Sequence, residues 1–137
     1  MTPEAISALE LTRIALEFVR FTNTFWGVIA TVTIALLGWV FGSNKKWVLI
    51  QRVATSVAYG LIACINCLAQ LRFNGLINAS IADLKAMSAS HPEIANLHAQ
   101  LVHLGTLDDE VIVLIYAVIA TAVIVITLRQ NQFAHQG

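Results

Sequence analysis

The chain has 137 residues, of which 58% are hydrophobic and only 12% are charged, and its eight Lys and Arg balance its eight Asp and Glu. A soluble domain usually carries about 25% charged residues, so this composition provides too little polar surface to cover a water-exposed globule. The neutral balance gives no electrostatic support for nucleic-acid binding, and two cysteines are too few for a disulfide framework.

The first predicted element is an amphipathic helix over residues 3–20. Pro3 suits the first turn of a helix, and Glu4 lies near the positive end of the helix dipole. Four charged residues then follow at steps of 3, 4 and 3, which places them on one face with opposite charges adjacent: Glu10, Arg13, Glu17 and Arg20. This stripe is either a solvated face or a docking face for a partner.

Three uncharged stretches predict membrane-spanning helices over residues 21–42, 47–71 and 107–128. The longest uncharged run has 24 residues and the shortest has 18, whereas a spanning helix needs about 20 apolar residues. Helix is expected because a chain in hydrocarbon must form its own backbone hydrogen bonds. The first span continues the phase of the N-terminal helix, which predicts one helix over about residues 3–41, roughly 58 Å long. Such a helix either protrudes from the bilayer or bends near residues 23–27 to lie in the interface.

The connections between the spans differ in length. A short connection, GSNKK, joins the first two spans. The segment before the third span is too long to be structureless, and we expect two extramembrane helices in residues 76–104, separated just before Pro92. A short tail, 129–137, ends an all-α membrane protein that forms a single domain over 1–137.

The distribution of charge predicts the orientation in the membrane. Lys45, Lys46 and Arg52 lie in or beside the short first connection, and short loops dominate the positive-inside rule. All eight acidic residues fall on the opposite side of the predicted spans. We therefore expect an inner (plasma) membrane protein of a bacterium, with the N-terminus outside and the C-terminus in the cytoplasm.

Small residues recur along the first two spans and predict a face for helix packing or oligomerisation. Residues of this kind let helix backbones approach closely in lipid, which supplies no hydrophobic drive for association. The predicted face consists of Gly27, Thr31, Ala35, Gly38, Ser56, Gly60 and Cys64. The alternative is that small residues are simply common in membrane helices.

Two further clusters have weaker functional interpretations. Asp108, Asp109 and Glu110 open the third span, where acids suit the helix dipole, and they are also a possible cation site or pore mouth. Cys64 and Cys67 form a C-x-x-C, a motif with redox meaning when it opens a helix near a βαβ unit. Inside a predicted span, the two cysteines are better interpreted as small packing residues.

No pattern in the chain indicates a catalytic centre, a cofactor or a metal site. His91, His98 and His103 are spaced by seven and five residues, which does not match the i, i+4 pair of helical zinc sites. No Asp, Glu, Lys, Arg or His lies at the centre of a predicted span, which disfavours ion-coupled transport.

The sequence therefore favours a non-catalytic protein, not an enzyme, that acts by helix association. Its expected partners are the lipid bilayer and either further copies of the chain or another membrane protein, which it would serve as an accessory subunit. The alternative is a homo-oligomeric pore. Three spans with the N-terminus outside resemble one class of holins, although only Arg129 carries charge after the last span, where that class has a strongly charged tail. A second alternative is a membrane redox protein that uses Cys64 and Cys67.

Overall fold

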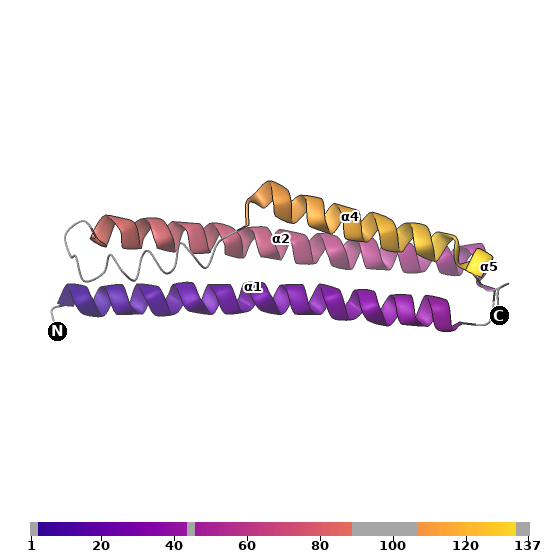
Figure 1. The fold of residues 1–137 in the computed structure, drawn as a ribbon, viewed down its shortest axis with the longest axis horizontal. Coiled ribbons are helices and arrows are strands. Elements are labelled where there is room, and N and C mark those ends of the chain that lie inside the picture. The colour runs from indigo at the N-terminus through magenta and orange to yellow at the C-terminus, as the bar shows by residue number, and fades with distance from the viewer. Residues whose placement is uncertain (1–2, 44–45, 89–106, 134–137) are drawn as a thin grey trace. The chain divides into compact units, whose positions relative to one another are not determined.

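The computed structural model describes residues 3–43, 46–88 and 107–133, and all the secondary structure within them is helical (Figure 1). Three of the helices described are long and apolar enough to cross a membrane, which confirms that part of the sequence-based prediction. The helices are α1 (Pro3–Gly42), α2 (Leu49–Ser88), α4 (Asp109–Leu128) and the short α5 (Gln130–Phe133).

Helix α1 is one helix of 40 residues, as the continuous phase of its sequence predicts. Its threonines fit this helix because their hydroxyls bond to carbonyls one turn earlier. Thr24 Oγ1 donates to Arg20 O at 3.0 Å, and Thr31 Oγ1 donates to Gly27 O at 2.8 Å. Each hydroxyl is thereby satisfied inside its own helix and needs no partner on another element.

Helix α2 differs from the sequence-based prediction. The predicted second span ends at residue 71 and the predicted extramembrane helix begins at residue 76, but the structure has one helix from Leu49 to Ser88. No proline interrupts this junction, and Gly75 weakens a helix interior by only about 1 kcal/mol. The remainder of the predicted segment 76–104, beyond Ser88, lies outside the described residues.

The chain forms two compact units, each built from segments distant in sequence. Unit 1 comprises residues 1–24 and 70–109, and unit 2 comprises residues 25–69 and 110–137. In unit 1, the Phe73 ring of α2 packs against two rings of α1, with centroid distances of 5.9 Å to Phe18 and 5.5 Å to Phe21. Aromatic packing therefore joins α1 and α2 in this unit.

The three long helices of unit 2, α1, α2 and α4, are joined pair by pair through side-chain contacts. Thr33 of α1 and Tyr59 of α2 share a hydrogen bond of 2.6 Å between their hydroxyls. Tyr116 of α4 accepts a hydrogen bond from Asn66 of α2 and stacks on Trp26 of α1. Figure 1 shows α4 lying along the first half of α2, as these contacts require.

The outer surface of the described helices is apolar. There are 24 large hydrophobic side chains classed as exposed, and the most exposed are Ile50 at 75%, Ile34 at 72% and Ile65 at 67%. Seven buried side chains, in contrast, are polar: Ser56, Asn66, Gln70, Asn74, Ser80, Thr127 and Gln130. Eleven further buried side chains are hydrophobic, so the interior of the described residues is mixed, whereas a surface this rich in large apolar side chains is not one that water selects.

The continuity of α2 predicts opposite effects for two substitutions at one glycine. Gly75 is exposed, and a Cβ there would meet no atom within 4 Å. Gly75→Ala should therefore stabilise the protein by up to about 1 kcal/mol, and Gly75→Pro should destabilise it by about 3 kcal/mol or more. Thermal unfolding in detergent, followed by circular dichroism, measures both effects. Tolerance of proline would show that residues 72–76 are a connection rather than helix.

Candidate functional site

The inward face of α2 carries three amide side chains at intervals of four residues. Asn66, Gln70 and Asn74 are 6%, 1% and 3% exposed, and the i, i+4 spacing places them on the same face of the helix. A buried amide is costly unless it is hydrogen-bonded, so the partners of each side chain decide what it does. Among the described residues, the Oε1 atom of Gln70 has no hydrogen-bond partner.

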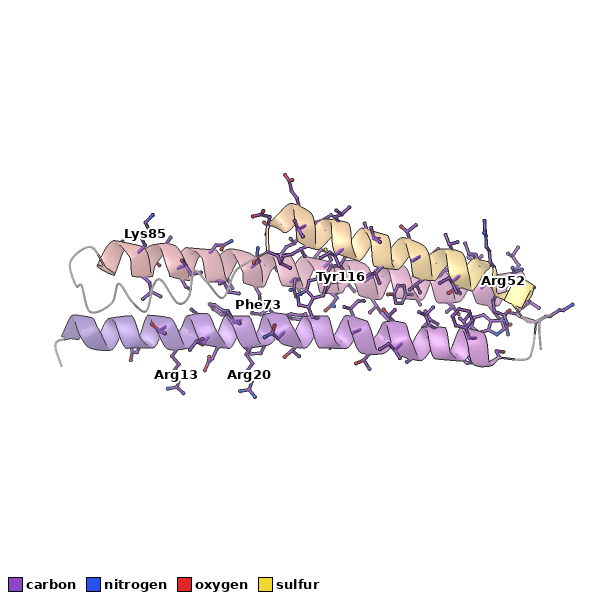
Figure 2. The ribbon with its side chains drawn as sticks, viewed as in Figure 1. Arg13, Arg20, Arg52, Phe73, Lys85 and Tyr116 are labelled. Atoms are coloured by element: carbon purple, nitrogen blue, oxygen red, sulfur yellow. The ribbon has the colours of Figure 1, made fainter. Side chains whose placement is uncertain are left out.

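Asn66 joins all three helices of unit 2. Its Nδ2 atom donates to the backbone oxygen of Phe25 in α1 and to the hydroxyl of Tyr116 in α4, each at 2.9 Å. The Tyr116 ring is buried and stacks on Trp26, with ring centroids 5.1 Å apart (Figure 2). We call these four residues the Asn66 cluster. Its contacts fix how α1 and α4 meet α2 in this unit.

A groove of about 300 Å³ lies beside the Asn66 cluster, between α1 and α4 of unit 2. The groove is lined by Trp26, Ile29, Ala30, Thr33, Ile34 and Ile119. No ionisable group is among these residues, and the hydroxyl of Thr33 is already engaged with Tyr59. The lining therefore suits an apolar chain and offers no acid, base or nucleophile to a substrate.

In unit 1, Asn74 binds the segment that leads into α4. Its Nδ2 atom donates to Leu107 O at 2.9 Å and to Asp109 Oδ1 at 2.6 Å. Of the three acids predicted as a pore mouth or cation site, Asp109 thus has a structural partner. Asp108, Asp109 and Glu110 are all exposed, and the part of the chain that the structure describes holds no group of three acidic, His or Cys residues suited to a metal ion.

In unit 2 the connection between α1 and α2 is tied to α5, and the first turn of α2 is tied to the C-terminal end of α4. Trp47 N donates to Asn131 Oδ1 at 3.0 Å, and Asn131 Nδ2 returns a bond of 3.3 Å to Trp47 O. Arg52 Nη1 donates to Leu128 O at 2.7 Å, which satisfies a carbonyl at the end of α4 (Figure 2). The Trp47 ring lies 4.5 Å from that of Trp39, centroid to centroid. These polar contacts hold together segments about 80 residues apart in sequence.

The small residues predicted on α1 are exposed among the helices that the structure describes. Gly27, Thr31, Ala35 and Gly38 are all exposed, and a Cβ at either glycine would meet no atom within 4 Å. The close packing of α1 within the described chain therefore does not use this set. It leaves an open face on α1.

The small residues predicted on α2 have three different environments. Ser56 is buried, Gly60 is half-buried with its Cβ position 3.9 Å from Ile124 Cδ1, and Cys64 is exposed. Because a helix has 3.6 residues per turn, each four-residue step turns the side chain a little further around the helix axis. These steps lead from the buried face at Ser56 to the exposed face at Cys64. The inner face of α2 follows steps of three and four residues instead, through Tyr59 and Ala63.

The charged stripe of α1 lies on the surface of unit 1. Glu10, Arg13, Glu17 and Arg20 are all exposed, and Figure 2 shows Arg13 and Arg20 pointing away from α2. Arg13 Nε and Glu17 Oε1 are 3.9 Å apart, and both side chains are more than half exposed. An ion pair this accessible to water contributes little to stability.

The remaining candidates for chemistry have no catalytic surroundings in the described residues. Cys64 is exposed, Cys67 is half-buried, and both are free thiols. His91, His98 and His103 lie outside the described residues.

Several residues that organise these contacts were not singled out from the sequence. Tyr116 is the only aromatic residue between Asp109 and Leu128, and this isolation in an aliphatic helix was the available signal. Asn74 extends the four-residue spacing of Asn66 and Gln70, and this regular spacing of amides is visible in the sequence. Gln130 and Asn131 carried no such signal, because their partner is the backbone of Trp47, distant in sequence.

A double-mutant cycle at Asn66 and Tyr116 should reveal a coupling between the two side chains. Hydrogen bonds between membrane helices average about 0.6 kcal/mol and reach about 1.7 kcal/mol, so we expect a coupling energy in that range. The cycle compares Asn66→Ala, Tyr116→Phe and the double variant by unfolding in detergent. Thr24→Val is the matched control, since the Thr24 hydroxyl bonds within its own helix. Strict additivity of the two substitutions would contradict the Asn66 cluster.

Comparison of this chain with protein-family models, with curated proteins and with solved structures finds no match. Its function is therefore inferred from the residues and contacts described above.

Proposed function

We propose that this chain is an integral membrane protein with three spans that works without catalysis, through association of its helices. It does so as a homo-oligomer or as an accessory subunit of a larger membrane complex. The observation that carries the proposal is the surface of the described helices, which holds 24 large exposed apolar side chains, while amide and hydroxyl groups such as those of Asn66 and Tyr116 are buried and bond between helices.

Hydrocarbon accounts for this distribution where water does not. Each Å² of apolar surface exposed to water costs about 25 cal/mol, so 24 large exposed hydrophobic side chains would be a heavy penalty for a soluble protein. In a bilayer the same side chains face lipid tails at no such cost. Amides turned inward then find partners on other helices, as Asn66 does.

The open face of α1 supports association as the mode of action. Helices in lipid associate by close packing of small residues. Such a surface is formed by Gly27, Thr31, Ala35 and Gly38, and no described helix covers it. The orientation follows from charge: the connection at residues 42–48 and the C-terminal tail face the cytoplasm of a bacterial cell, and the N-terminus faces outside.

The pore alternative gains no comparable support within unit 2. Two pairs of its described side chains bond across helices, Asn66 to Tyr116 and Tyr59 to Thr33, and so engage polar groups that could otherwise line an opening. Leakage of dye from liposomes tests that alternative directly.

Alkaline carbonate washing of membranes that contain the protein tests the insertion of its helices. We expect the full chain to remain in the membrane pellet, because three apolar helices embedded in hydrocarbon are not released by high pH. A peripheral protein in the same preparation is the control and should be washed off. Recovery of the chain in the supernatant would exclude the proposal.

Bulky substitutions on the open face of α1 test the association. Gly27→Leu combined with Ala35→Leu should lower the molar mass in mild detergent toward the 14.9 kDa of one chain, measured by light scattering. Both positions are exposed, so the fold should persist. Ala58→Leu with Ala122→Leu, at exposed positions of α2 and α4, is the matched control and should leave the mass unchanged.

A wild-type chain that is already monomeric would contradict the homo-oligomer. The accessory-subunit form then predicts a protein that co-purifies from native membranes and is lost with the same α1 variant. If the α1 variant changes neither self-association nor the binding of a co-purifying protein, the proposal that this face mediates association is wrong.

A further inference from the structure

The positive charges of unit 2 gather at one end. Lys46, Arg52 and Arg129 are the cations that the structure describes in this unit, and Glu110 is its one described acid. Glu110 lies at the start of α4, whereas Arg129 directly follows the end of that helix. We call the three cations the basic end.

Contacts between distant segments hold the basic end together. Lys46 precedes Trp47, whose backbone is bound on both sides by Asn131. Arg129 precedes Gln130, whose Oε1 accepts from Trp47 N at 3.3 Å. The Arg52 guanidinium, anchored to Leu128 O, belongs to the same end (Figure 2). The gathering of charge is thus a product of the fold, since Arg52 and Arg129 are 77 positions apart.

Among the described residues of unit 2, no acid lies close enough to neutralise these charges. Glu110 precedes Leu128 by 18 positions along α4, which corresponds to about 27 Å at 1.5 Å per residue. At this distance Glu110 forms no ion pair with the basic end, since an ion pair needs its charged atoms within about 4 Å. Lys46 and Arg129 are also exposed, so their charges are available to a partner.

Two tryptophans place the basic end at the level of lipid headgroups. Trp39 is 60% exposed and packs against the buried Trp47, whose Nε1 donates to Ser43 Oγ at 3.1 Å. Tryptophan is enriched at the membrane–water interface, where its ring meets lipid and its N–H meets polar groups. Cations beside such an aromatic pair lie where phospholipid phosphates are.

We propose that the basic end binds the headgroups of anionic phospholipids, and this rests on the proposed function because it requires α1, α2 and α4 to be in a bilayer. The exposed ammonium of Lys46 and guanidinium of Arg129 contact the anionic headgroups, while Arg52 is held in place by α4. A basic residue near an anionic surface favours that surface by about fivefold in binding. Anionic lipid should therefore be enriched several-fold around this end relative to zwitterionic lipid.

Tryptophan quenching by brominated lipids tests this enrichment. The full chain, with Trp26→Phe so that Trp39 and Trp47 report, is reconstituted in mixed phosphatidylcholine and phosphatidylglycerol vesicles. Bromine is placed on the acyl chains of one lipid or of the other, with the composition unchanged. We expect brominated phosphatidylglycerol to quench the tryptophan fluorescence more strongly than its mole fraction in the bilayer predicts. High salt should reduce this excess quenching.

Two charge variants locate the site. Lys46→Gln with Arg129→Gln should remove the preference for phosphatidylglycerol. Arg13→Gln with Arg20→Gln removes the same charge from the stripe of unit 1 and should leave the preference intact. Retention of the preference in the first variant, or its loss in the second, would overturn the assignment.

The failure of this inference is distinguishable from the failure of the proposed function. Equal quenching by both brominated lipids, in proportion to their share, would refute selective binding while leaving the protein embedded. An absence of quenching by either lipid would mean that the tryptophans do not meet a bilayer, and both proposals would fall together.

Discussion

The hydrogen bonds of a few buried amides are the constraint on which the arrangement of the helices depends. A side-chain amide removed from water needs a hydrogen-bond partner. Where that partner is on another helix, it must lie level with the amide along the helix axis. Asn66 meets this need in unit 2 by bonding to α1 and α4 together, and Asn74 meets it in unit 1 by holding the start of α4. Apolar packing between smooth helix faces would permit many registers, whereas these bonds select one in each unit.

The inward orientation of the amides of α2 explains which side chains of α1 make contacts and which stay exposed. Because the amides of α2 face inward, the contacts of α1 involve Phe25, Thr33 and the aromatic ring of Trp26. Within the described residues, the small-residue face of α1 is exposed, and it is the surface that the proposed association uses. Near Trp47, the side chains of Asn131 and Arg52 bind backbone atoms of segments distant in sequence. These contacts bring the positive charges of unit 2 to one end. The two proposals thus concern two surfaces of unit 2, one apolar and close-packing, the other basic and aromatic.

The candidate site was only partly readable from the sequence. The four-residue spacing of Asn66 and Gln70 was visible, but their partners were not, because a hydrogen bond between helices depends on their relative rotation. The junction near Gly75 was assigned incorrectly as a break, since a glycine before a polar segment is equally compatible with helix and loop. A pattern of small residues on α1 and α2 suggested one shared face, although the structure exposes the first set and spreads the second across three environments.

The sequence by itself determined that the described chain is helical and that three of its helices are long and apolar enough to cross a membrane. These properties are local: they depend on the number of consecutive apolar residues and on the absence of charge within each run. Only the tertiary structure decided that Tyr116 meets Asn66, that Asn131 binds the backbone of Trp47, and that Arg52 and Arg129 share one end. Those pairings join residues 50 to 84 positions apart, and their geometry is set by how the helices pack, which no run of neighbouring residues encodes.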